Sequence, residues 1–458
     1  MCDCRVGRKK SETMKLYHVL AHALLLQLYA AIMTVSAAAA TAVEEEERSL
    51  LITNGIENVG NRGYEESLSL KKKKRALLVD EYVSSVRDWV PRKDDSVLPI
   101  GLTASEEAEV LQQQTATKGN GLTTTRSNNN SSKKRKKPKK PRFLPEWNPM
   151  QGVLIAYSTS KNFGLSLELI KAMSKRAKIF CLLKREHKKT VKRAFKKAGI
   201  PSKKVVMIYG NVDSYWTRDY GPWFVSTKSS KEKGIAVVNH TYNRPRLNDN
   251  DAPKKVAEKL DVPYYDSNII GCGGNMMVDG NGQATATHIA YTENKQCNTK
   301  DDTSVPLLQC KKVDKVMKKF YGVKTFHVVA DPSNVYIDHV DCWAKYLSPT
   351  KILIREVSML HPQFDDIEEV VAYFSDTQTA EGNDWEIVRV WTDSDQPYTN
   401  SLILNGEVFV PIMGSEFDTA ALETYRSAMP DYKVSGWEGD WKSTDALHCR
   451  TLGIPEFQ

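Results

Sequence analysis

The chain has 458 residues, of which 41% are hydrophobic and 26% are charged. This composition is ordinary for a globular protein and excludes a collagen-like chain, a wholly disordered chain and a small disulfide scaffold. The formal net charge is +9, but Lys71–Arg75 carries five positive charges and Lys133–Arg142 carries eight. Without these two runs the chain has a net charge of −4. A protein that binds nucleic acid over its whole surface is therefore excluded.

The N-terminus has the features of a secretory leader. Basic residues up to Lys15 precede the uncharged stretch Leu16–Ala42, which ends in small residues of the kind that a signal peptidase requires. We therefore expect residues 1–42 to be a signal peptide cleaved near Ala42, and the protein to be secreted or to enter the secretory pathway. An uncleaved membrane anchor is the alternative, because the stretch is long enough to span a bilayer. Two histidines within it favour cleavage.

Residues 43–142 contain polar, low-complexity tracts and few large apolar residues. Such a segment cannot bury enough surface to offset the entropy lost on ordering, so we expect a disordered N-terminal extension that serves as a Lys-rich linker or pro-region. One helix is predicted within it, over residues 76–90, because apolar side chains recur there at helical spacing. The basic run that ends at Arg142 is interpreted as solvated linker, with protease processing or nuclear import as alternatives.

Residues 143–458 alternate short apolar strands with amphipathic helices, which predicts an α/β domain. The dipeptide Asn405-Gly406 separates the last two predicted strands and is typical of a type I′ hairpin turn. Asp418 is expected to cap the last helix. The predicted strands are Val153–Tyr157, Ile179–Leu183, Val205–Tyr209, Ile352–Val357, Ile387–Trp391, Leu402–Leu404 and Val408–Val410, and the predicted helices are Leu165–Ala177, Glu186–Gly199, Asp365–Ser375 and Asp418–Ala428.

The cysteines lie in different sequence environments. Cys181 and Cys342 lie in apolar, strand-like runs, where we expect buried and inert thiols. Cys297 and Cys310 flank a polar loop in a chain expected to be secreted, and they are candidates for a disulfide. The role of Cys272, within Gly-Cys-Gly-Gly-Asn, stays open. The chain has no Cys-x-x-Cys pair, which argues against a structural zinc site.

Three segments place charged residues among apolar and aromatic ones. They are Ser214–Phe224 with Arg218 and Asp219, Asn243–Asp249 with Arg244 and Arg246, and Tyr336–Trp343 with His339 and Asp341. If the third segment is a strand, His339 and Asp341 face the same side, because side chains alternate along a strand. A structural polar cluster at the end of a strand is the alternative interpretation of each segment.

Together these segments resemble the bacterial, Porphyromonas-type peptidylarginine deiminases, relatives of agmatine deiminase in the guanidine-modifying superfamily. The resemblance covers residues 143–458. It implies a pentein fold, a five-fold pseudosymmetric α/β-propeller with the active site at its centre. Seven motifs occur in the order seen in that family: Glu146–Leu154, TRDYGPW, NRPRLND, Gly273–Gly280, HVDCWAK, Tyr398–Ser401 and LHCRT.

The resemblance assigns catalytic roles to four residues. Cys449 is the expected nucleophile, which attacks the guanidinium carbon as a thiolate. His339 is expected to protonate the departing ammonia and then to activate the water that hydrolyses a covalent thiouronium intermediate. Asp219 and Asp341 are expected to hold the guanidinium cation, and His448 is expected to support the site without acting as a base. The implied reaction yields citrulline and ammonia and requires neither a cofactor nor a metal.

The resemblance also implies a substrate. Arg244 and Arg246 match a pair that contacts the α-carboxylate of a C-terminal arginine in this family, and two cations would repel the ammonium group of agmatine. A structural ion pair of these arginines with Asp249 or Asp251 is the alternative. The other implied substrate contacts are Trp216, Tyr336, Ile337 and Asn400.

Three functions follow from the sequence, in order of preference. The first is deimination of C-terminal peptidyl-arginine or free arginine. The second is deimination of agmatine to N-carbamoylputrescine, and the third is a catalytically silent protein that binds polyanions through the basic run. The expected partner is a small guanidine or an arginine-containing peptide. Nucleic acid is not required, and a stable membrane partner is expected only if the leader is uncleaved. The sequence does not predict an oligomeric state.

Overall fold

A computed structural model describes residues 137–228, 234–244, 246–294, 310–333, 337–393 and 396–457. Several predicted features lie outside these ranges: the leader 1–42, the extension as far as residue 136 with its helix 76–90, Cys297 and Tyr336. Among the described residues, no helix has both the length and the apolar character needed to cross a membrane.

The described residues form five small sheets, and each sheet combines antiparallel with parallel strand pairs. This confirms the predicted α/β class. The sheets, with strands in hydrogen-bonding order, are β17-β2-β3-β4 (Leu452–Pro455, Met150–Tyr157, Lys178–Leu183, Val205–Tyr209), β1-β5-β6-β7 (Arg142–Phe143, Trp223–Ser226, Ile235–Tyr242, Tyr264–Gly271), β10-β9-β8 (Thr325–Val329, Gln283–Thr287, Met277–Val278), β11-β12-β13 (Ala344–Ser348, Lys351–Glu356, Glu386–Trp391) and β14-β15-β16 (Leu402–Leu404, Glu407–Ile412, Lys433–Glu438).

Helices and short helical turns connect these strands. The α-helices are α4 (Leu167–Arg176), α5 (Lys188–Lys197), α6 (Thr217–Tyr220), α7 (Leu247–Asn250), α8 (Ala252–Leu260), α9 (Ile289–Thr292), α10 (Lys311–Val316), α11 (Phe364–Ser375) and α12 (Asp418–Ala428). The 3₁₀ turns are η1 (Arg185–His187), η2 (Ser202–Lys204), η3 (Gly273–Asn275) and η5 (Val340–Cys342), and η4 (Met317–Tyr321) is a π-helix that continues α10.

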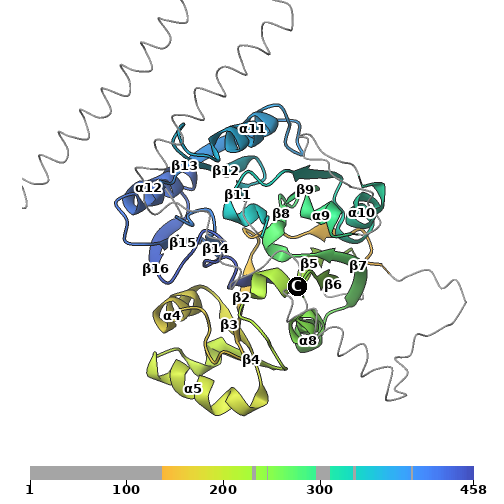
Figure 1. The fold of residues 1–458 in the computed structure, drawn as a ribbon. Helices are drawn as coiled ribbons and strands as arrows, with labels where there is room; N and C mark the ends of the chain where they lie inside the picture. The colour runs from red at the N-terminus through yellow and green to blue at the C-terminus, as the bar shows by residue number, and fades with distance from the viewer. Residues whose placement is uncertain are drawn as a thin grey trace, which may run out of the picture. The chain divides into compact units, whose positions relative to one another are not determined.

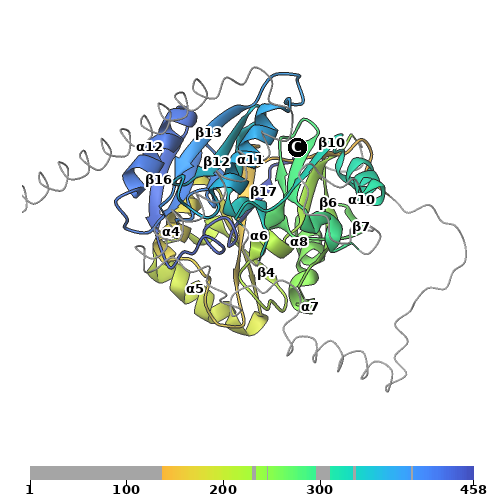
Figure 2. The ribbon, with the colours of Figure 1, turned by 45° about the horizontal axis from the view of Figure 1, so that its top comes forward.

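The sheets follow one another in chain order around a common centre (Figure 1). Helices α4, α5, α10, α11 and α12 lie toward the periphery in this view, and α6 and β17 lie near the middle in Figure 2. Strand β17, close to the C-terminal end, pairs with β2 close to the beginning of the described chain. Segments that are far apart in the sequence therefore lie side by side in this fold.

Helix α4 illustrates how the sequence forms these units. Ser166 precedes the helix and its side chain accepts a hydrogen bond from the amide of Leu169 at 3.2 Å, which caps the first turn. Basic residues in the last turn complement the helix dipole. Leu169, Ile170 and Met173 lie on one face and are fully buried against the core. Each such side chain contributes about 1.5–3 kcal/mol through burial.

The predicted elements agree with the structure to within a few residues. The hairpin between β14 and β15 is confirmed, because Asn405 and Gly406 both have positive φ angles, 45° and 75°, as a type I′ turn requires. The Asn405 side chain also bonds both the amide and the carbonyl of Met150, which ties the turn to the neighbouring sheet.

One conditional expectation does not apply, and one local prediction is wrong. Asp341 lies in the 3₁₀ turn η5 and His339 immediately precedes it, so this segment is not the strand that would have given them a shared face; Asp338 has a left-handed φ of 50°, which ends any extended run. Asp418 is the first residue of α12, and Phe417 occupies the cap position. The Asp418 carboxylate instead accepts from the amides of Met413 and Ser415 in the preceding loop.

The described cysteines include four free and buried thiols: Cys181, Cys272, Cys342 and Cys449. The predicted burial of Cys181 and Cys342 is thus confirmed. Burial raises the pKa of both thiols, which keeps them in the unreactive protonated form. Cys310 is disulfide-bonded.

Candidate active site

The loop before α6 places Asp219. The carboxylate of the buried Asp249 accepts hydrogen bonds from the amide of Asp213 at 2.7 Å and from the hydroxyl of Ser214 at 2.7 Å. The hydroxyl of Thr217 donates to a carbonyl of β2 at 3.1 Å. These bonds fix the single turn of α6. Asp219 is fully buried, and among the described residues neither of its carboxylate oxygens has a hydrogen-bond partner of normal geometry.

Asn400 holds Cys449 in place. Its side-chain oxygen accepts from the amides of His448 and Cys449 at 2.9 and 3.2 Å, and its side-chain nitrogen lies 3.2 Å from Cys449 Sγ. The backbone carbonyl of Cys449 accepts from the amide of Arg218 at 3.1 Å. The thiol is therefore fixed from two sides, and one of them is the turn that carries Asp219.

The turn η5 brings His339 and Asp341 to the same place. The side-chain oxygen of Asn275 accepts from the amide of Val340 at 3.1 Å and thereby fixes the turn. Asp341 Oδ2 lies 3.8 Å from Cys449 Sγ, and His339 Nδ1 lies 4.0 Å from Asp219 Oδ1.

Gly274 lies between three of these groups. A Cβ atom on Gly274 would lie 2.8 Å from Asp219 Oδ1, 2.9 Å from His339 Nδ1 and 3.1 Å from Asp341 Oδ2. Only glycine leaves room for all three at once. The structure thus brings the four predicted catalytic residues into one buried cluster, from segments that are up to 230 residues apart in the chain.

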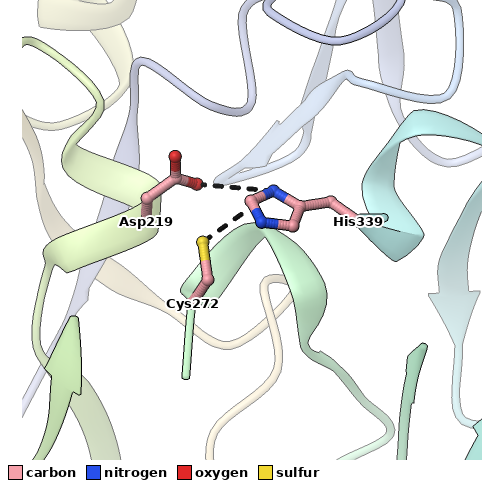
Figure 3. A group of neighbouring side chains, drawn as sticks. All are labelled: Asp219, Cys272 and His339. Carbon is pink, nitrogen blue, oxygen red and sulfur yellow. Dashed lines mark hydrogen bonds and ion pairs between the residues drawn. The ribbon is translucent and has the colours of Figure 1, made fainter. Parts of the chain in front are cut away.

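Cys272, whose role the sequence leaves open, also belongs to this cluster. Its Sγ lies 3.8 Å from His339 Nδ1. Figure 3 shows the thiol of Cys272 and the carboxylate of Asp219 both directed toward the imidazole of His339.

A network of charged side chains holds Asp341 in place through His448. His448 lies between two carboxylates, with Nδ1 2.7 Å from Asp341 Oδ2 and Nε2 2.9 Å from Glu146 Oε1. Glu146 also pairs with Arg218, and with the buried Lys345 at 2.7 Å. Burial opposes ionisation of Glu146, but Lys345, Arg218 and His448 together hold its pKa well below the usual value. His448 thus holds Asp341, as a supporting residue would.

The two aspartates have opposite pKa shifts. Burial, and then the negative charge of Asp341, raise the pKa of Asp219 to about 8. Burial also acts to raise the pKa of Asp341, but its hydrogen bond to His448 and the nearby positive charges outweigh this and lower it. The site therefore has one stable anion and one carboxyl group that ionises readily only when a cation is bound.

Burial also shifts the pKa values of His339 and Cys449. Burial lowers the pKa of His339 to about 4, so the free imidazole is neutral near pH 7. Burial, and then the charges of Asp341 and Asp219, raise the pKa of the Cys449 thiol well above its usual value. A cation bound beside Cys449 would favour its thiolate, because the positive charge would offset the negative charges of Asp341 and Asp219.

The other predicted contacts surround this cluster. The side chain of Arg244 is 2% exposed and its Nη1 lies 3.9 Å from Glu293 Oε1. Its buried Nε has no hydrogen-bond partner within the described ranges. The guanidinium of Arg246 lies 5.0 Å from the ring centroid of Trp216. Ile337 is buried in the apolar cluster beside η5.

For Arg244, the ion pair found among the described residues is not the alternative one with Asp249 or Asp251. Asp249 binds the loop before α6, as described above, and Asp251 lies 3.1 Å from Lys255. The structure therefore places Arg244 near Glu293 rather than near Asp249.

Several known proteins with similar sequences or folds are named as deiminases. The family described as Porphyromonas-type peptidyl-arginine deiminase matches residues 142–455. An agmatine deiminase of Medicago truncatula is 25% identical over 304 residues, which are 55% of this chain and 78% of that protein. The solved agmatine deiminase of Enterococcus faecalis superposes with a TM-score of 0.57 and 20% identity over 70% of this chain and 98% of that one. For the agmatine deiminase of C. jejuni the TM-score is 0.53 and the identity is 15%, over 69% and 96% of the two chains.

The fold is thus that of the guanidine-modifying superfamily. Because the family match covers more than half of the sequence, the chain belongs to the Porphyromonas-type peptidyl-arginine deiminases, relatives of agmatine deiminase. It is accordingly an enzyme, a hydrolase of the type that acts on C–N bonds of amidines.

Proposed function

We propose that this enzyme hydrolyses the guanidinium group of an arginine-type substrate to a ureido group and ammonia, with Cys449 as the nucleophile. One observation carries the proposal. Asp219 is fully buried, and in the part of the chain that the structure describes both of its carboxylate oxygens lack hydrogen-bond partners of normal geometry, although Asp341, His339 and Cys449 lie within the same cluster. A buried carboxylate without partners is costly unless a cationic ligand satisfies it.

Substrate binding would prepare the nucleophile. A guanidinium is a planar cation with N–H donors along its edges, so Asp219 and Asp341 can each accept charge-assisted hydrogen bonds from it. Its positive charge would lower the raised pKa of Asp219 and of Cys449, because the two carboxylates no longer repel an additional anion. The nucleophile would then be generated mainly when substrate is present.

The covalent steps follow from this arrangement. When substrate binds, the thiol proton of Cys449 passes to the neutral His339, which gives a thiolate and an imidazolium. The thiolate attacks the guanidinium carbon, and the imidazolium of His339 donates this proton to the nitrogen that leaves as ammonia. The resulting thiouronium is attacked by water, and His339 accepts the proton of that water. Collapse of the second tetrahedral intermediate expels the Cys449 thiolate and leaves a C=O bond, so the product is a ureido group.

The five sheets are consistent with the five-fold α/β-propeller of the pentein fold, which we propose for this domain. Each sheet has at least one antiparallel and at least one parallel pair, as five related units would have. The pairing of β17 with β2 would join the last unit to the first.

For the substrate we propose a C-terminal arginine, of a peptide or as the free amino acid. Arg244 supports this choice, because its buried Nε has no hydrogen-bond partner and a substrate carboxylate would satisfy it. Arg246, stacked on Trp216, would be the second cation of this subsite. Agmatine is the second candidate: the curated relatives are agmatine deiminases, and the nearby carboxylate of Glu293 would suit an ammonium group.

Ammonia release from agmatine, free arginine and peptides with terminal or internal arginine would distinguish these substrates. With C-terminal arginine as substrate, Arg244→Ala should raise KM at least about tenfold, since a charge-assisted hydrogen bond contributes about 1.5–3 kcal/mol. The exposed Arg426→Ala is the matched control and should leave KM unchanged. If wild type prefers agmatine and Arg244→Ala does not weaken that reaction, the carboxylate subsite is refuted.

We further propose that the enzyme is secreted after removal of residues 1–42. Residues 43–142 would then serve as a linker or pro-region of the catalytic domain. The basic-then-apolar pattern of the leader supports this. Expression of the full chain in a secreting host, followed by N-terminal sequencing of the protein in the medium, would test it. Retention of the intact leader in the membrane fraction would favour an anchor instead.

A further inference from the structure

Three chemically different ligand groups meet beside the catalytic cluster. Asp219 on α6, Cys272 immediately before η3 and His339 immediately before η5 place a carboxylate oxygen, a sulfur and an imidazole nitrogen within 4.8 Å of one another (Figure 3). All three side chains are at most 2% exposed. The proposed deimination uses Asp219 and His339, but it gives no role to the thiol of Cys272.

We propose that Asp219, Cys272 and His339 form an inhibitory binding site for Zn²⁺, which excludes the guanidinium substrate. Metal binding does not depend on the proposed reaction, but its inhibitory effect rests on it, because substrate and metal would both require the carboxylate of Asp219.

The ligand set suits zinc. Thiolate, imidazole and carboxylate are the groups that bind Zn²⁺ in proteins, at about 2.3 Å for sulfur and about 2.0–2.2 Å for nitrogen and oxygen. Tetrahedral bonds of these lengths separate neighbouring ligand atoms by roughly 3.3–3.6 Å. The observed separations from His339 Nδ1 are 3.8 Å to Cys272 Sγ and 4.0 Å to Asp219 Oδ1. Shifts of a few tenths of an ångström would bring these two pairs to bonding geometry, and the third pair, Asp219 and Cys272, lies within 4.8 Å. The fourth position would be left for water.

The surroundings also favour a cation. The carboxylate of Asp219 is buried, and within the described part of the chain its only hydrogen-bonding neighbour is the thiol of Cys272, itself a proposed ligand, so coordination would replace that contact and no other. Burial, and then the charge of Asp219, raise the pKa of the Cys272 thiol, so Zn²⁺ has to displace the thiol proton as it binds. The charge of Asp341 attracts the metal, whereas Arg244 opposes it.

The position of Cys272 makes the proposal testable, because the metal would bind a cysteine other than the proposed nucleophile. Zinc binding should be measured by calorimetry on the purified protein without substrate, for wild type and for the single variants Cys272→Ala, Cys449→Ala and Cys181→Ala. Cys181 is a buried free thiol outside the cluster and serves as the matched control.

Wild type should bind one Zn²⁺, and Cys449→Ala and Cys181→Ala should retain that affinity within about threefold. Cys272→Ala should bind at least about 100-fold more weakly, because even the loss of a residue that only supports a zinc ligand costs 10–100-fold. Equal affinity of Cys272→Ala and wild type would overturn the proposal. So would loss of binding in Cys449→Ala alone, which would place the metal on the nucleophile.

Two further measurements separate the metal site from folding and from the reaction. Co²⁺ bound to wild type should show thiolate-to-metal charge-transfer absorption, and its absence refutes ligation by sulfur even if Cys272→Ala misfolds. In ammonia-release assays, Zn²⁺ should inhibit competitively with the substrate, and noncompetitive inhibition would contradict a shared Asp219. If the protein binds Zn²⁺ in this way but releases no ammonia from any guanidine, the proposed function fails and the metal site stands.

Discussion

Substitution of Gly274 by alanine should reduce activity far more than it reduces stability. Ordinary van der Waals contact begins at 3.4 Å, and the added Cβ would lie 2.8 Å from Asp219 Oδ1, 2.9 Å from His339 Nδ1 and 3.1 Å from Asp341 Oδ2. These three groups would have to retreat by up to about 0.6 Å. Overpacking of this kind costs about 1–3 kcal/mol of unfolding free energy.

The catalytic loss should be larger, because all three displaced groups belong to the proposed reaction. A misplacement of this order can reduce the rate about 100-fold, so kcat/KM for ammonia release should fall by about that factor. Gly382→Ala is the matched control: Gly382 has a φ of 82° with open space around its Cβ position, so alanine there costs a similar 1–2 kcal/mol without touching the site. Urea unfolding would verify that the two losses of stability are comparable. If Gly274→Ala kept kcat/KM within twofold of Gly382→Ala, the crowding argument would be refuted.

Two further predictions concern charge. Because the pKa of Asp219 is raised to about 8, its carboxylate is mostly protonated below that pH. The pKa of the Cys449 thiol is raised as well, so kcat/KM should rise by at least about tenfold per pH unit below pH 8 and should go on rising above it. A flat profile from about pH 6 to pH 9 would contradict this. Glu146→Gln leaves the buried Lys345 without its 2.7 Å ion-pair partner and should cost about 3–5 kcal/mol in urea unfolding. Glu423→Gln, in an exposed pair, should cost less than about 1 kcal/mol, and equal losses would show that the buried network contributes no more than a surface pair.

The periodic parts of the fold could be predicted from the sequence alone. Strand β4 was predicted with its observed ends, and Asn405-Gly406 identified the hairpin, because local alternation and turn chemistry fix these features. The turn η5 was missed. Its shape depends on a hydrogen bond to Asn275, 65 residues earlier, which no local pattern contains.

In the candidate site, too, some residues could be predicted from the sequence and others could not. Motif resemblance identified Cys449, His339, Asp219 and Asp341, but spacing alone could not show that they meet. The contributions of Glu146 and Gly274 were not foreseen, although both lie in the motifs that carried the resemblance. The ion pairs of Glu146 and the space left by Gly274 depend on the packing of segments that are distant in the sequence, so no local pattern predicts them.

The position of the covalent bond tests the central claim most directly. Wild-type enzyme should be quenched with acid during turnover and digested, and the peptides that contain Cys449 and Cys272 should be compared by mass spectrometry. The account predicts a thiouronium adduct on Cys449 that is absent from Cys449→Ala, which should release no ammonia. An adduct on Cys272, or full turnover by Cys449→Ala, would contradict it.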